Sequence, residues 1–143
     1  MKITKIEDLN NIPEGITELD ISCLGLTTLP KLPQSLTKLY CGYNQLTSLD
    51  LPQSLTYLQC SHNKLTTLYN LQQGLTYLDC SYNKLTILDI ENCNNLKNFD
   101  YNNNNFPEEM QTILKDKDLS IQEKINKLID GCLIPYDNSF VLK

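Results

Sequence analysis

Apolar residues recur in the same frame four times along the chain. The frame L-x-x-L-x-C-x-x-N-x-L begins at Leu36, returns at Leu55 and Leu75, and appears in a weaker form at Leu96. Within each copy apolar and polar residues alternate, as in Leu58-Gln59-Cys60. This alternation is the two-residue period of a short strand with one buried face. We therefore predict one short strand in each copy.

The spacing of the copies predicts how they associate. The four copies start 19, 20 and 21 residues apart. One short strand cannot bury its leucines alone, so successive copies must stack into a parallel sheet over a continuous core. The return segment 46–54 contains Pro52 and shows no helical period. We predict that it is extended, with a turn at Gln53-Ser54.

An asparagine occupies the same place in every copy, at the point where the chain leaves the strand and turns inward. The four residues are Asn44, Asn63, Asn83 and Asn104. Backbone groups lose their sheet partners at such a turn, and a buried amide side chain offers them both donors and an acceptor. The frame and the period resemble those of leucine-rich repeats over about residues 9–106. The resemblance implies a right-handed coil held by an asparagine ladder.

The amino-terminal end departs from this frame. In residues 16–26 the position expected for asparagine is taken by Leu24, so we interpret this copy as an atypical, capping coil. Residues 1–12 are read as a partial repeat, in which Leu9 and Ile12 align with Leu26 and Leu29.

After Phe106 the repeat ends and helical signals begin. Pro107 followed by two glutamates suits a first helical turn, and Ser120 with Glu123 forms a capping box ahead of a second helix that would stop at Gly131. We predict an α/β-type repeat solenoid with a short parallel β-sheet, an extended convex side and a C-terminal helical cap. The solenoid spans residues 1–106 and the cap 107–143, within one domain.

Three cysteines share the inward strand position, Cys41, Cys60 and Cys80. In-register side chains on neighbouring strands stay about 4.8 Å apart, which exceeds the usual Cβ separation of a disulfide. A straight row also does not converge on a zinc ion. We expect buried thiols, with disulfides and a metal as the alternatives, and no cofactor.

The sequence offers no assembled catalytic group. Its single histidine, His62, directly follows Ser61, and neighbouring residues on a strand point in diverging directions, so a nucleophile–base contact is not expected. The common hydrolase, nucleotide-binding and zinc-protease motifs are missing. We predict a protein that is not an enzyme.

Composition restricts the partners and the location. The net charge is -5 and all cationic side chains are lysine, which disfavours nucleic acid as a partner. Neither a signal-peptide pattern nor a membrane span is evident, so we expect a cytoplasmic protein without membrane contact. The absence of alanine indicates an AT-rich genome. The repeated Leu-Pro-Gln-Ser-Leu resembles repeats of amoebae and of the giant viruses that infect them, and the short repeats also resemble those of bacterial effectors. A viral protein would act in the host cytoplasm or in the virion.

The outward strand positions predict a binding surface rich in tyrosine and flanked by carboxylates. Tyrosine is a rigid contact residue, and aspartates favour a basic partner. Tyrosine also suits strand surfaces in general. We predict a monomeric scaffold that binds a protein or peptide on its concave sheet. The alternatives are an adaptor that uses the terminal helices as a second docking surface, and a purely structural virion protein. The predicted contact residues are Tyr40, Tyr43, Tyr57, His62, Tyr77, Asp79, Tyr82 and Asp100.

Overall fold

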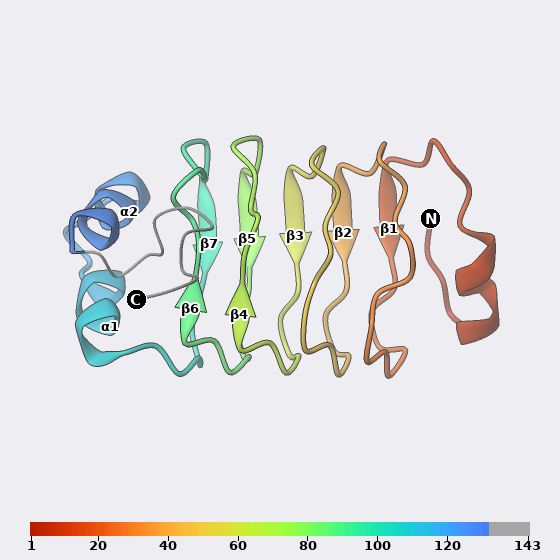
Figure 1. Ribbon diagram of the computed structural model, residues 1–143, viewed down its shortest axis with the longest axis horizontal. Helices are drawn as coiled ribbons and strands as arrows, with labels where there is room; N and C mark the ends of the chain where they lie inside the picture. Colours follow the sequence, from red (N-terminus) through yellow and green to blue (C-terminus); the bar gives the residue numbers. More distant parts are fainter. Residues whose placement is uncertain (132–143) are drawn as a thin grey trace, which may run out of the picture.

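The computed structural model describes residues 1–131, and its main feature is a row of stacked coils (Figure 1). Each coil adds one three-residue strand to a parallel sheet in the order β1-β2-β3-β5-β7. The predicted repeat solenoid with a parallel sheet is therefore confirmed. The strands are β1 (Glu18–Asp20), β2 (Lys38–Tyr40), β3 (Tyr57–Gln59), β5 (Tyr77–Asp79) and β7 (Asn98–Asp100).

The middle residue of each strand faces the core. Leu39, Leu58 and Leu78 are paired across neighbouring strands and are completely buried. The next inward position holds the cysteines, of which Cys41 and Cys60 are also completely buried, as predicted. Because side chains alternate along a strand, the residues on either side of each central leucine must point outward.

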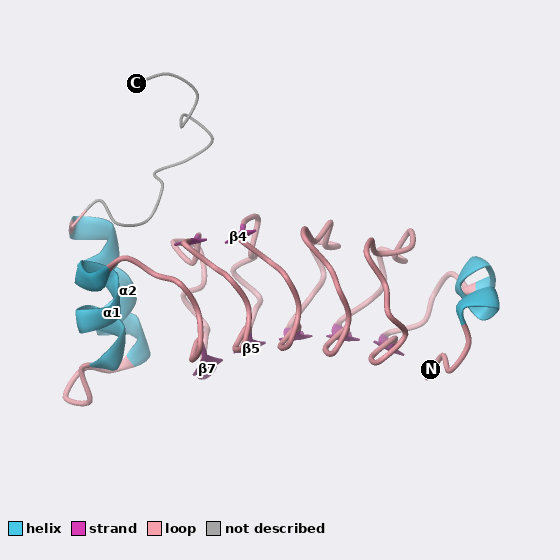
Figure 2. Ribbon diagram, turned by 90° about the horizontal axis from the view of Figure 1, so that it is seen from below, coloured by secondary structure: helices cyan, strands magenta, loops and turns pink. Residues whose placement is uncertain are grey.

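The convex side lies opposite the sheet and is extended, as predicted (Figure 2). Two of its return segments form short parallel strands, β4 (Thr67–Leu68) and β6 (Ile87–Leu88). These segments contain no proline, so their N–H groups can bond between coils, as in the 2.9 Å bond from Asp89 N to Leu68 O. The preceding return segment contains Pro52, which lacks an N–H donor, and it forms no strand.

The asparagine ladder predicted from the sequence is present. The Oδ1 atom of Asn63 accepts from the backbone N of Leu46 at 2.9 Å, and its Nδ2 donates to the carbonyl oxygens of Cys41 and Cys60 at 3.0 and 3.1 Å. In the first coil, where Leu24 replaces the asparagine, Asn44 Oδ1 accepts from the backbone N of both Leu24 and Leu26, each at 3.0 Å. The amides thus join successive coils through their buried turns.

The amino-terminal residues lie against the first strand. Lys2 pairs with Asp20 in a parallel bridge, which places Ile3 in the buried inward position that Ile21 holds in the next coil. A 3-10 helix, η1 (Ile6–Asn11), follows, and Leu9 packs partly buried against the core. The sequence pattern did not predict this short helix.

Two helices cover the last coil beside β7 (Figure 1). They are α1 (Glu108–Lys115) and α2 (Ile121–Asp130). Met110 and Leu114 of α1, with Ile125 and Leu128 of α2, are buried against the solenoid core. The predicted capping box at Ser120 is formed, and α2 ends at its cap residue Gly131. The rest of the predicted cap, including Cys132, lies outside the described residues. Within residues 1–131, no helix is long and apolar enough to cross a bilayer.

Candidate binding surface on the sheet

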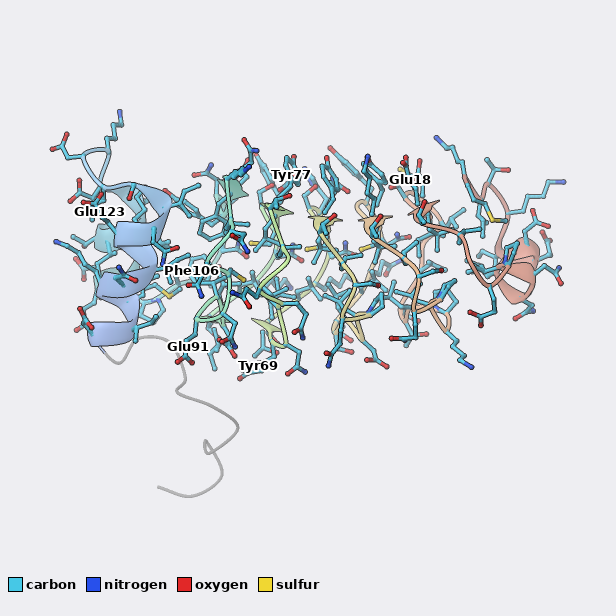
Figure 3. All side chains as sticks on the ribbon, turned by 90° about the horizontal axis from the view of Figure 1, so that it is seen from above. Glu18, Tyr69, Tyr77, Glu91, Phe106 and Glu123 are labelled. Carbon is cyan, nitrogen blue, oxygen red and sulfur yellow. The ribbon has the colours of Figure 1, made fainter. Side chains whose placement is uncertain are left out.

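Aromatic side chains form two rows on the outward side of the sheet. The strand row consists of Tyr40, Tyr57 and Tyr77. The turn row lies just beyond the strands and consists of Tyr43, His62 and Tyr82. In Figure 3, Tyr77 extends from the same side of the coils as Glu18, whereas Tyr69 extends from the opposite side. Neighbouring rings within each row contact one another, so the structure arranges the six predicted aromatic contact residues in two rows.

The strand row follows from the register of the sheet. Tyr57 is the paired neighbour of Tyr77, and their rings stack with centroids 4.0 Å apart and planes 5° from parallel. Tyr40 stands at the other outward position of its strand and leans onto Tyr57, with centroids 5.1 Å apart. Burial and the neighbouring hydroxyls of Tyr77 and Tyr40 raise the pKa of Tyr57 above its usual value.

The turn row is held by an unusual backbone conformation. Tyr43, His62 and Tyr82 all lie in the left-handed region, with φ of 54°, 54° and 52°. The N–H of each residue donates to a carbonyl of the following coil, at 3.0, 3.1 and 2.9 Å respectively. The ring of His62 stacks between its neighbours, with centroids 4.2 Å from Tyr43 and 4.3 Å from Tyr82. Identical backbone geometry in successive coils thus aligns the three rings. Tyr43 and Tyr82 remain 57% and 51% exposed.

The two predicted acidic contact residues, Asp79 and Asp100, also accept hydrogen bonds within the turns that follow their strands. Asp79 Oδ1 accepts from the backbone N of Ser81 at 3.1 Å and from its hydroxyl at 2.6 Å. Asp100 Oδ1 accepts from the backbone N and the side-chain Nδ2 of Asn102 at 3.0 and 2.8 Å. One oxygen of each carboxylate is therefore committed to its own turn. Among residues 1–131, the Oδ2 atoms of both carboxylates have neither an ion pair nor a hydrogen bond, so they face solvent as acceptors.

Gln59 lies at an outward strand position of this surface, but it is not among the predicted contact residues. Its Oε1 accepts from the backbone N of Gly42 at 3.2 Å, and its Nε2 donates to the hydroxyl of Ser61 at 2.7 Å. A Cβ on Gly42 would lie 2.5 Å from Gln59 Oε1, so glycine permits this approach. For the two aspartates, the sequence does indicate this role, because the spacing D-x-S or D-x-N is typical of turns that a side chain caps. Gln59 reaches a different coil, and no local pattern predicts that contact.

The residues considered for catalysis or metal binding occupy structural positions. The hydroxyl of the buried Ser61 accepts from Gln59, while the ring of His62 is stacked between two tyrosines. Burial raises the pKa of the Cys41 thiol to about 12 and raises that of Cys60 as well. The cysteines that the structure describes are unpaired. In the same part of the chain, no cluster of three or more histidine, cysteine, aspartate or glutamate side chains could hold a metal ion.

Known proteins share this architecture. The family model of the Leucine Rich Repeat matches residues 74–96. The solved structure of YopM, a leucine-rich effector protein from Yersinia pestis, superposes with a TM-score of 0.60 at 39% sequence identity and covers 68% of this chain. The chain matches 28% of the length of YopM. A comparison with curated protein sequences gives no match.

These similarities agree with the repeat frame, the parallel sheet and the asparagine ladder described above. The resemblance to amoebal and giant-virus repeats stays a prediction. The matched repeat model, the superposition on YopM and the stacked coils together show that the chain is a leucine-rich repeat protein.

Proposed function

We propose that this chain is a protein-interaction scaffold that binds a protein or peptide partner on the outward side of its sheet. Leucine-rich repeat proteins generally bind proteins, and repeat solenoids offer extended surfaces for that purpose. The observation that carries the proposal is the pair of aromatic rows. Stacked, partly exposed rings on a rigid sheet give a partner a large contact area that loses little conformational freedom on binding.

The charge around the rows favours a basic partner. Asp79 and Asp100 are neighbours in register on β5 and β7, and within residues 1–131 each has one oxygen that makes no hydrogen bond. Lys38 is occupied by an ion pair with Glu18, at 3.8 Å. A lysine or arginine of the partner would therefore meet acceptors beside the tyrosines, and rising salt would weaken that part of the binding.

We also propose where in the cell the protein acts. YopM is described as an effector protein, and its similarity to this chain supports a role in the cytoplasm of a host cell. The partner would then be a host protein, bound by a single copy of this chain.

Selection of displayed random peptides on the full chain, followed by affinity measurement, tests the binding surface. We expect Tyr57→Ala with Tyr77→Ala to weaken the selected peptides by about thirtyfold, because central aromatic anchors cost about 2 kcal/mol or more on truncation. The matched control is Tyr69→Ala, which removes an exposed tyrosine from the opposite side. Asp79→Asn should weaken basic peptides, while Asp50→Asn, at an exposed convex position, should not.

The same measurement separates the alternatives. A pair of changes at exposed positions of α2, Asn126→Ala and Lys127→Glu, leaves both aromatic rows intact. Peptides that lose affinity for this variant but not for the tyrosine variant would assign binding to the helical cap, as in the adaptor alternative. If no peptide is selected, a purely structural protein becomes the better interpretation.

A further inference from the structure

The asparagine ladder uses each amide as a bridge to the preceding coil. Asn83 Oδ1 accepts from Leu65 N at 3.0 Å, while its Nδ2 donates to Cys60 O at 3.0 Å. Asn63 makes the same pair of bonds to Leu46 N and Cys41 O, at 2.9 and 3.0 Å. Every coil thus presents one N–H and one C=O at a spacing that a single primary amide satisfies.

The last coil presents the same two groups to the cap. The residue equivalent to Leu65 is Phe106, and the residue equivalent to Cys60 is Tyr101. No acceptor within residues 1–131 takes the backbone N–H of Phe106. Among the described residues, the carbonyl of Tyr101 accepts only from its own coil's Asn104, at 2.9 Å, whereas the carbonyl of Cys80 accepts from two asparagines.

The helical cap replaces only part of a further coil. Gln111 Nε2 donates to Phe106 O at 2.7 Å, as a backbone N–H does one coil earlier, where Asn105 N donates to Leu85 O at 2.9 Å. The hydroxyl of Tyr101 donates to the carbonyl of Leu114 in α1. Neither contact supplies an amide at the next position of the ladder. Figure 3 shows Phe106 between the last coil and the cap.

A pocket of about 250 Å³ lies at this position. It is lined by residues 101–104 and Phe106 of the last coil, and by Gln111, Leu114 and Lys115 of α1. We propose that this pocket binds a primary amide, the side chain of an asparagine or glutamine. The amide oxygen accepts from Phe106 N–H, and the amide nitrogen donates to Tyr101 C=O.

The chemistry of the two groups selects an amide over a charged ligand. A carboxylate would place a second acceptor against the Tyr101 carbonyl, and an ammonium would meet the Phe106 N–H donor, so each leaves one contact repulsive. Lys115 Nζ already donates to Gln111 Oε1 at 3.1 Å.

Titration of the ¹⁵N-labelled full chain, followed by NMR, tests the site with three matched probes. N-acetyl-L-asparagine N-methylamide carries the primary amide, and the aspartate and leucine analogues share its shape and backbone. We expect the asparagine probe to move the Phe106 amide proton downfield, with a dissociation constant at least about tenfold lower than that of either analogue. The Leu85 amide, already bonded to Asn104 Oδ1 at 3.0 Å, should not move.

A variant distinguishes whether this chain or a partner supplies the amide. Beyond residue 131 the chain contains one asparagine, Asn138, and no glutamine. If Asn138 is the ligand, hydrogen exchange at Phe106 N–H should be at least tenfold faster in Asn138→Asp than in the wild type. If a partner supplies the amide, exchange should be equally fast in both, and the asparagine probe should slow it in both. Equal responses to all three probes, with fast exchange at Phe106 throughout, would show a merely hydrated pocket and overturn the proposal.

Discussion

The imidazole of His62 lies flat against the ring of Tyr82, with centroids 4.3 Å apart and planes 8° from parallel. Both residues occupy the same left-handed position in successive coils, and the N–H of each bonds to the coil that follows. The turn row therefore results from one backbone conformation repeated at the spacing of the solenoid. Left-handed backbone is unfavourable for most side chains, so this row carries a conformational cost that substitutions can reveal.

The conformational cost of the left-handed backbone can be measured at Cys23 without disturbing the stacked rings. Cys23 begins the same series of left-handed residues, with φ of 61°, and its side chain is exposed. We expect Cys23→Asn to stabilise the protein by about 0.5–1 kcal/mol, because asparagine enters the left-handed region more readily. Thermal unfolding in the presence of reductant measures the effect. Cys23→Val is the control and should destabilise, since a β-branched residue resists this conformation; stabilisation by valine would contradict the argument.

Loss of one ladder amide should weaken the whole domain. Asn63→Ala removes the acceptor of the buried Leu46 N–H and the donor to two buried carbonyls. Unsatisfied buried groups cost about 1–3 kcal/mol, and urea unfolding should show a loss of that size. The matched control is Asn105→Ala, an exposed asparagine in the last coil, which should change the free energy of unfolding by less than about 0.5 kcal/mol. Equal effects of the two substitutions would show that the ladder is not a structural element.

Thiol reactivity should follow burial along the chain. Cys23 is exposed, whereas Cys41, Cys60 and Cys80 are completely buried. In the native protein an alkylating reagent should modify Cys23 rapidly and the three buried thiols only after unfolding. Mass measurement after alkylation in denaturant without reductant should then find all three as free thiols. A crosslinked pair among them, or stoichiometric zinc in the native protein, would contradict the buried-thiol interpretation.

The buried thiols should also make the fold sensitive to alkaline pH. Burial raises the pKa of Cys41 to about 12, against 9.0 for an ordinary thiol, and it raises the pKa values of Cys60 and Cys80 in the same direction. The folded state therefore favours the protonated thiol. Its stability is complete below about pH 9 and falls as the pH rises toward 12, by about 1.4 kcal/mol per pH unit for each such thiol.

Urea unfolding between pH 8 and pH 11, with reductant, measures this slope. Cys41→Ala should be less stable than the wild type at pH 8 because a cavity remains. Its stability should nevertheless decline less steeply above pH 9, since one titrating thiol is gone. Tyr57, whose pKa is also raised, contributes equally to both proteins and does not affect the comparison. Parallel slopes would show that the Cys41 thiol does not contribute to the alkaline loss.

The repeat frame was sufficient to predict the register of the sheet. A shift of the strand register by one residue would exchange the buried and exposed positions. The repeat frame therefore places Leu58 on the buried face and Tyr57 on the outward face of the strand. The same reasoning placed Cys41 inside and Tyr77 outside, and both positions are confirmed. The helix signals at Pro107 and Ser120 were equally local, since capping depends on a few consecutive residues.

The details of the candidate surface depended on contacts between coils. The sequence could place Asp79 and Asp100 on the outward side, but the structure shows that each gives one oxygen to its own turn. Gln59 reaches Gly42 of the preceding coil, and no spacing within a single repeat reveals this contact.

By itself, the sequence determined the period, the buried face of each strand and the residues of the asparagine ladder, because these follow from alternation and spacing along the chain. Only the tertiary structure decided which rings stack, which polar groups are already bonded and where the ladder lacks its next amide. Those features depend on distances between residues about 20 positions apart in the sequence, such as His62 and Tyr82. Such distances are set only when one coil packs on the next and each backbone group either finds a partner or does not.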